Sequence, residues 1–194
     1  MESNKTLRYP VLAEYFFPAM GIFSDICFAV FGSVFIGLCA QIEFPLFPVP
    51  ITGQTFGVLL IGLAFGRNLG AVTLLAYLFE GAMGLPFFSG GAGGIPHLAG
   101  PTGGYLIGMV FAAYVVGFLA EKGWDRRFDT TVLAMLAGNA VIYAFGLPWL
   151  ARFVSANKVF EVGFFPFLIG DLLKLAMVAL VLPLGWQVLQ RIKK

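Results

Sequence analysis

Long apolar runs alternate with short polar or glycine- and proline-rich segments along nearly the whole chain. Apolar runs of close to 20 residues are typical of transmembrane helices, because about 20 helical residues cross the hydrocarbon core of a bilayer. The pattern predicts six such helices, at about residues 22–40, 52–65, 69–84, 105–120, 132–150 and 164–189. We therefore expect an all-α fold, with residues 1–21 as an N-terminal cytoplasmic or interfacial segment and residues 22–190 as one six-helix membrane domain.

The composition supports a polytopic membrane protein and excludes several functions. Hydrophobic residues make up 59% of the 194 residues and charged residues only 11%, whereas about 25% of the residues in a soluble domain are charged. No phosphate-binding loop of the GxxxxGK[ST] type occurs, so another chain would have to supply ATP chemistry for uphill transport. No basic patch with interleaved aromatic residues occurs either, and we expect no nucleic-acid partner.

Side chains that commonly serve catalysis or metal binding are scarce. Cys27 and Cys39 both fall in the first run, about 18 Å apart along a helix, which is too far for a disulfide between them. His97 is the single histidine, and it has no companion side chains at the spacing of a metal-ligand set. We therefore expect no metal, no cofactor and no intramembrane enzyme, which would need a nucleophile with a base or paired acids and bases.

The distribution of basic residues predicts the orientation in the membrane. Six helices place both chain termini on one side, and that side collects Lys5, Arg8, Arg67, Lys122, Arg126, Arg127, Arg191, Lys193 and Lys194. The other side holds only Arg152 and Lys158. Because loops rich in Lys and Arg stay in the cytoplasm, we expect cytoplasmic termini in a multi-pass protein of the cell membrane.

Two opposite charges interrupt the last apolar run. Between Phe164 and Leu184 the only ionisable side chains are Asp171 and Lys174. A charge at the centre of a bilayer costs about 2.5–3.5 kcal/mol on insertion scales, so such residues usually mark a functional site. The alternative is an i,i+3 ion pair that neutralises itself on one face of the helix.

Three unusual loops lie on the predicted outer side. Residues 41–50 are rich in proline, residues 84–104 contain eight glycines, and residues 151–163 are polar. Gln54, Tyr105, Arg152 and Asp171 all fall near the outer ends of their predicted helices. Polar groups that converge at one mouth of an apolar bundle are typical of a small-molecule pocket, which here would open outward. We expect the glycine-rich loop to fold over the ligand; the alternative is a flexible linker.

Six motifs in order cover most of the predicted membrane domain: Pro48-Val-Pro-Ile-Thr-Gly-Gln-Thr-Phe56, Gly84-Leu-Pro-Phe87, Gly100-Pro-Thr-Gly-Gly-Tyr105, Gly138-Asn139, Gly146-Leu-Pro-Trp-Leu150 and Gly170-Asp-Leu-Leu-Lys174. From about residue 35 to residue 185 the chain resembles the BioY family, the biotin-specific substrate-binding (S) components of energy-coupling-factor (ECF) transporters. The resemblance implies a six-helix protein that captures biotin from outside with high affinity. It also implies partnership with a transmembrane coupling subunit and two ABC-type ATPases, and release of biotin inside after the protein topples in the membrane.

The resemblance also implies roles for individual residues. Asp171 and Lys174 match the family's contacts to the ureido ring, and Tyr105 matches an aromatic residue of the pocket. The small residues Ala29, Ser33 and Gly37 resemble the stripe that docks on the coupling subunit.

The chemistry of the residues extends this pocket. An ionised Asp171 can accept from ureido N–H groups while the ammonium of Lys174 donates to the ureido carbonyl. We add Gln54 and Asn139 to the substrate-binding residues, and we expect Arg152 to bind the ligand carboxylate. The alternative function is a stand-alone facilitator or channel that carries a small solute, such as a related vitamin, through the same pocket without a partner.

Overall fold

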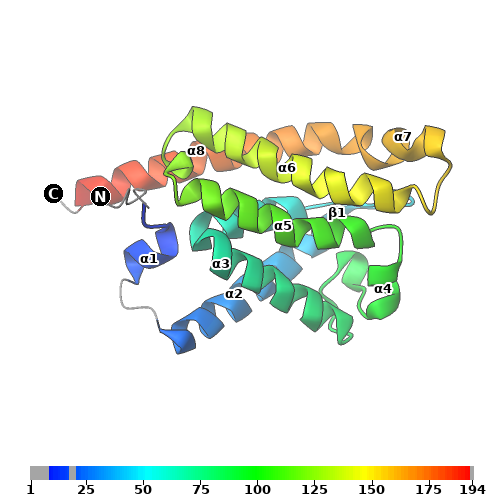
Figure 1. Cartoon of the computed structure of the whole chain (residues 1–194), viewed down its shortest axis with the longest axis horizontal. Coiled ribbons are helices and arrows are strands. Elements are labelled where there is room, and N and C mark those ends of the chain that lie inside the picture. The colour runs from blue at the N-terminus through cyan, green and yellow to red at the C-terminus, as the bar shows by residue number, and fades with distance from the viewer. Residues whose placement is uncertain (1–8, 18–20, 193–194) are drawn as a thin grey trace, which may run out of the picture.

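A computed structural model gives the structure of residues 9–17 and 21–192. Four basic residues counted toward the cytoplasmic side, Lys5, Arg8, Lys193 and Lys194, lie outside these described residues. The fold is built from helices, which confirms the all-α class (Figure 1). The α-helices are α1 (Leu12–Phe16), α2 (Ile22–Gln41), α3 (Gln54–Ala82), α4 (Ile95–Ala99), α5 (Gly103–Ala120), α6 (Phe128–Leu150), α7 (Val159–Gly163) and α8 (Leu168–Ile192).

Short elements complete the loops. The 3-10 turns are η1 (Ser89–Gly91), η2 (Trp124–Arg126), η3 (Ala156–Lys158) and η4 (Phe165–Phe167). Strands β1 (Glu43–Phe44) and β2 (Ile51–Thr52) pair antiparallel, with Glu43 opposite Thr52, and so close the proline-rich segment into a hairpin. Within the described part of the chain, five helical stretches are long and apolar enough to cross a membrane: Ile22–Gln41, Gln54–Ala82, Gly103–Ala120, Phe128–Leu150 and Ala156–Leu189.

The second of these stretches folds back on itself. Gly66 has φ 79° and ψ 178° inside α3, a conformation that residues with a Cβ rarely adopt. The arms 54–65 and 67–82 then pack together, so that a Cβ on Gly70 would lie 3.1 Å from the Cα of Gly62. The predicted helices 52–65 and 69–84 correspond to these two arms, and the break between them is the single residue Gly66. The number of membrane crossings stays a prediction.

The main helices pack in the order α2, α3, α5, α6 and α8 (Figure 1). Small residues bring their backbones close together. A Cβ on Gly62 of α3 would stand 2.8 Å from the Ala113 carbonyl of α5, and one on Gly108 of α5 would stand 3.0 Å from the Ile142 carbonyl of α6. Close contact of this kind is the usual packing of helices in membranes, where van der Waals contact replaces hydrophobic burial.

Helix α1 and the last turns of α8 lie at the same end of the bundle (Figure 1). The Tyr15 hydroxyl donates to the Leu189 carbonyl at 3.4 Å, and the Tyr9 amide donates to the Glu121 carbonyl at 2.8 Å. Arg67 pairs with Glu121 at this end, with 3.3 Å between Nε and Oε2. Hereafter this is the terminal end of the bundle. The prediction that it faces the cytoplasm stays a prediction.

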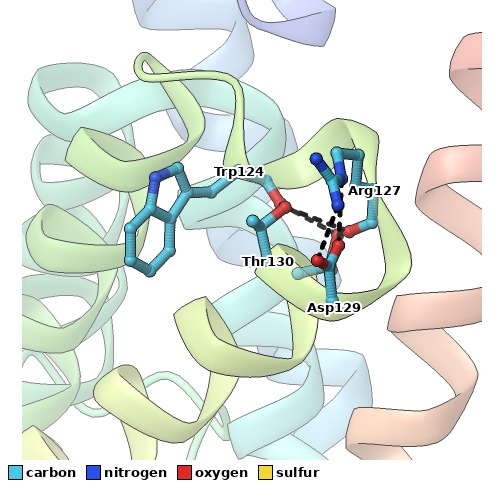
Figure 2. Close-up of polar contacts among 5 residues, drawn as sticks. Trp124, Arg127, Asp129 and Thr130 are labelled. Carbon is cyan, nitrogen blue, oxygen red and sulfur yellow. Dashed lines mark hydrogen bonds and ion pairs between the residues drawn. The ribbon is translucent and has the colours of Figure 1, made fainter.

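The turn that enters α6 is fixed by its own polar side chains (Figure 2). The Thr130 and Thr131 hydroxyls both donate to the Trp124 carbonyl, at 2.8 and 3.0 Å. The Arg127 guanidinium donates two hydrogen bonds to the Asp129 carboxylate, of 3.1 and 2.9 Å. These contacts hold η2 against the first turn of α6 and set the direction in which α6 leaves the terminal end.

The small-residue stripe predicted for partner docking is not an exposed surface in this structure. Ala29 and Ser33 are buried, and a Cβ on Gly37 would lie 3.2 Å from the Phe87 ring. A Cβ on the nearby Gly32 would lie closer still, 2.6 Å from the Thr73 methyl group of α3. In this conformation the small residues let this chain's own α3 and glycine-rich loop approach α2, and their role in partner docking stays a prediction. The outer face of α2 instead carries large side chains such as Phe31, which is 67% exposed.

Candidate small-molecule binding site

One cavity lies near the end of the bundle opposite the terminal end. There β2, the proline-rich segment and the glycine-rich loop meet helices α3, α5, α6 and α8. Its empty volume, counted with the open space at its mouth, is about 560 Å³. The lining residues are Val49, Pro50, Thr52, Gln54, Thr55, Ser89, His97, Thr102, Tyr105, Leu106, Met109, Asn139, Ile142, Tyr143, Phe167, Asp171 and Lys174. Five of the six predicted substrate-binding residues are in this set; Arg152 is the exception.

Asp171 and Lys174 lie one turn apart on α8 and face the cavity together. Lys174 Nζ is 3.4 Å from Asp171 Oδ1 and donates to the Thr55 hydroxyl at 2.7 Å. Thr55 lies in turn 3.5 Å from the same Asp171 oxygen. The self-neutralising ion pair therefore exists, but it lines a cavity and includes a third partner from α3. Because an ammonium carries three N–H donors, Lys174 keeps one for a ligand.

Helix α6 supplies a second partner for the same carboxylate. The Tyr143 hydroxyl donates to Asp171 Oδ2, so each carboxylate oxygen has a protein contact. Asn139 lies one turn earlier and also lines the cavity. Among the described residues, no side-chain hydrogen bond is seen for the Asn139 amide, although this side chain is mostly buried. Its donors and acceptor are therefore free to meet a polar ligand.

Gln54 lines the cavity, but its amide is occupied by protein partners. It accepts from the Thr52 hydroxyl at 2.9 Å and donates to the Tyr77 hydroxyl at 2.6 Å. Tyr77 then donates to the Phe87 carbonyl at 3.0 Å. Gln54 thus connects the cavity wall to the glycine-rich loop, and its side chain orients the wall.

Tyr105 contributes its ring and not its hydroxyl. The hydroxyl donates to the Gly163 carbonyl at 2.8 Å, which anchors α7 to α5. The ring meets Tyr143 edge-on, with centroids 6.3 Å apart, and stacks on Phe167 at 6.4 Å. These three rings form an aromatic wall suited to an apolar ligand surface.

Arg152 lies outside the cavity. It is exposed and its guanidinium sits 4.7 Å from the centre of the Trp149 ring. Trp149 itself is occupied by a hydrogen bond from its indole to the Gly100 carbonyl at 2.9 Å. The structure therefore does not bring Arg152 to the other predicted site residues.

The glycine-rich loop is packed and not a free linker. Gln41, at the end of α2, donates to the carbonyls of Pro86 and Phe88 at 3.3 and 3.1 Å and accepts from the Gly91 amide at 2.9 Å. Phe88 is fully buried, and its ring stacks on His97 with centroids 5.0 Å apart. The loop thereby presents Ser89 and His97 to the cavity.

Sequence reasoning left six polar lining residues out of the predicted site: Thr52, Thr55, Ser89, His97, Thr102 and Tyr143. Thr55 follows Gln54 in one polar run, and Tyr143 follows Asn139 by one helical turn, so both positions carried a usable signal. His97 and Thr102 sit in or beside the loop, where no periodicity points to a partner. Among residues 9–17 and 21–192, no group of three or more His, Cys, Asp or Glu side chains suited to a metal is found.

Comparison with known proteins agrees with these features. The family model of the BioY family matches residues 10–191. The chain is 42% identical over 142 residues to a probable biotin transporter BioY of Pyrococcus horikoshii, covering 73% of this chain and 83% of that protein. It is 43% identical over 143 residues to the biotin transporter BioY of Thermotoga maritima, with the same coverage of each, 73% and 83%.

A biotin transporter BioY of Rhizobium etli is 37% identical over 164 residues, covering 79% of this chain and 87% of that protein. The fold is similar to the crystal structure, at 2.1 Å, of the S-component for biotin from an ECF-type ABC transporter. The TM-score is 0.71 and the identity 24%, over 87% of this chain and 95% of that chain. The family model matches almost the whole length of this chain, and two relatives are more than 40% identical to it. This chain therefore belongs to the BioY family.

Proposed function

We propose that this chain is the biotin-binding membrane subunit of an uptake system. It is a multi-pass membrane protein of the BioY family, and the relatives named above are biotin transporters. The observation that carries the proposal is the group of Asp171, Lys174 and Thr55 at the wall of a largely apolar cavity. Charges buried beside an aromatic wall are matched to a ligand that is part apolar and part strongly hydrogen-bonding.

The ureido ring of biotin has that character. Its two N–H groups would donate to Asp171, and its carbonyl oxygen would accept from the remaining donor of Lys174. Asn139 would add an amide contact, since its side chain has no partner among the described residues. Gln54 and Tyr143 would orient these groups, while Tyr105 and Phe167 would cover the apolar rings. The wall of low polarity would strengthen each polar contact.

The partners and orientation belong to the same proposal. The sequence carries no ATP-binding motif, so a coupling subunit with two ABC-type ATPases would supply the energy. The cavity lies at the end opposite the terminal end, and the basic residues favour a cytoplasmic terminal end. The cavity would therefore face the outside in this conformation. We propose no catalytic role for any residue.

The direct test is calorimetry and thermal unfolding of the purified chain with biotin, desthiobiotin, lipoate and thiamine. We expect binding and stabilisation by the two compounds that carry the ureido ring, and little effect of lipoate or thiamine. A chain that biotin neither binds nor stabilises would overturn the proposal.

Uptake into liposomes separates the coupled system from a stand-alone facilitator. We expect this chain alone to give slow, low-capacity uptake, and addition of the coupling subunits with ATP to give accumulation. Rapid equilibration of biotin across the liposome membrane without ATP or partners would favour the facilitator.

A further inference from the structure

The polar groups of the cavity fall at two separate places. One group surrounds Asp171 and Lys174. The other consists of Ser89, His97 and Thr102, and these residues also line a second hollow with an empty volume of about 730 Å³. This second hollow, here called the vestibule, lies between the proline-rich segment and the glycine-rich loop and is bordered by Glu43, Pro48, Pro50, Ser89, His97 and Thr102. The cavity therefore has a rim, at which His97 and Thr102 face both spaces.

The rim is where the acidic tail of a ligand would arrive. A ligand anchored by its ureido ring at Asp171 extends its other end away from that carboxylate. Among the described residues that line the cavity and the vestibule, Lys174 is the single Lys or Arg, and it is already paired at the inner group. Arg152 lines neither space. The vestibule contributes the like charge of Glu43. Since Asn139 lies one turn from Tyr143 beside the inner group, the donors on the side of the vestibule are those of the rim.

His97 is held in a fixed orientation at this rim. Its ring is half-buried and stacks on Phe88 with an interplanar angle of 15°. Its Nε2 lies 3.4 Å from the Thr102 hydroxyl. Thr102 directly precedes α5, and the amino end of a helix carries partial positive charge. An imidazole N–H and a hydroxyl side by side can both donate to one carboxylate.

Resting on the proposed function, we propose that His97 and Thr102 hold the carboxylate end of biotin and select the acid over analogues with an uncharged tail. His97 is then a specificity-determining residue, and the role that the sequence suggested for Arg152 passes to the rim. Asp171 and Lys174 bind the ureido ring both in the acid and in the analogues with an uncharged tail.

The test compares biotin with biotin methyl ester, which keeps the rings and loses the tail charge. Calorimetry of the purified full chain gives a preference, the ratio of the Kd for the ester to the Kd for biotin. We expect the unmodified chain to prefer biotin. In His97→Phe, which keeps a flat ring on Phe88, the preference falls about tenfold, the value expected on loss of a hydrogen bond to a charged group. Thr102→Val gives a smaller fall, and neither variant weakens binding of the ester.

Three further variants make the result decisive. Arg152→Gln and the exposed loop variant Lys158→Gln keep the preference of the unmodified chain. Lys174→Met weakens both ligands by a similar factor, so its preference is unchanged. An unchanged preference in His97→Phe, or a collapsed preference in Arg152→Gln or Lys174→Met, overturns the assignment of the rim.

The same measurements separate this inference from the proposed function. If the unmodified chain binds neither probe, the proposed function fails and this inference fails with it. If it binds biotin but shows no preference over the ester, the inference alone fails.

Discussion

Helix α8 meets a buried carboxylate at each of its ends, and the two surroundings differ. Asp171, 7% exposed, belongs to α8 and contacts Lys174, Thr55 and Tyr143 while facing the cavity. Asp125, 1% exposed, comes from η2 and accepts from the Trp186 indole, while its other oxygen has no hydrogen-bond partner in the described structure. None of the described hollows is lined by Asp125.

The comparison shows why burial of a charge alone does not identify a binding site. Asp171 is surrounded by donors from three helices and keeps a face open to a ligand. Asp125 is enclosed by packing, with the Arg126 guanidinium stacked 4.3 Å from the Trp186 ring centre. The first carboxylate is therefore the one proposed above for ligand binding, whereas the second attaches η2 to α8 through its contact with Trp186.

The largest expected effect concerns the binding pair. Asp171→Asn and Lys174→Met should each weaken biotin binding by well over tenfold, because leaving one member of a buried pair alone costs about 3–5 kcal/mol. Calorimetry gives the affinity, and the detergent-stable yield reports folding. Asp125→Asn is the matched control, with unchanged affinity. Normal affinity in both pair variants would show that the two carboxylates do not differ as described.

Removal of a single donor at each end should separate the two roles further. Tyr143→Phe removes the donor to Asp171 Oδ2, and we expect roughly tenfold weaker biotin binding with little loss of stability. Trp186→Phe removes the donor to Asp125, and it should lower the unfolding temperature without changing affinity. Equal effects of both variants on affinity would contradict the division of roles.

The fold at the terminal end also depends on a backbone position. Gly66→Ala places a Cβ at φ 79° and 3.0 Å from Glu121 Oε1, and backbone with positive φ and ψ near 180° is essentially confined to glycine and costs other residues on the order of 1–3 kcal/mol. We expect a lower unfolding temperature and a lower yield, with normal biotin affinity in the folded fraction. Gly185→Ala is the control, since its Cβ meets no atom within 4 Å.

The smallest expected effect is a dependence of stability on pH. Burial raises the pKa of Asp125 from 3.8 to about 6, although the Trp186 hydrogen bond and Arg126 oppose the rise. Between pH 3.8 and about pH 6, Asp125 keeps its proton in the folded chain but has lost it in the unfolded chain. Stability therefore falls as pH rises through this window, and it stays reduced above it.

Asp125→Asn removes this penalty. Its unfolding temperature should exceed that of the unmodified chain at pH 7.5 by several degrees, since about 1 kcal/mol shifts this temperature by roughly 2–4 °C in a chain of this size. The difference should shrink at pH 4. A difference that is independent of pH would mean that Asp125 is ionised normally in the folded chain.

Part of this picture follows from the sequence alone. Apolar run length predicted the helices, because the thickness of a bilayer sets how many residues a crossing needs. The cost of charge in hydrocarbon singled out Asp171 and Lys174, and the order of the motifs indicated the BioY family. These features depend on neighbouring residues or on composition, so they can be read without coordinates.

The partners of those residues were decided by tertiary structure. Thr55 and Tyr143 reach Asp171 from 116 and 28 residues away, and no local periodicity predicts which helix faces meet. Packing also turned the stripe of Ala29, Ser33 and Gly37 inward, left Arg152 outside the cavity and brought His97 to its rim. A sequence shows which side chains can do chemistry, whereas the contacts between helices determine which of them share one cavity.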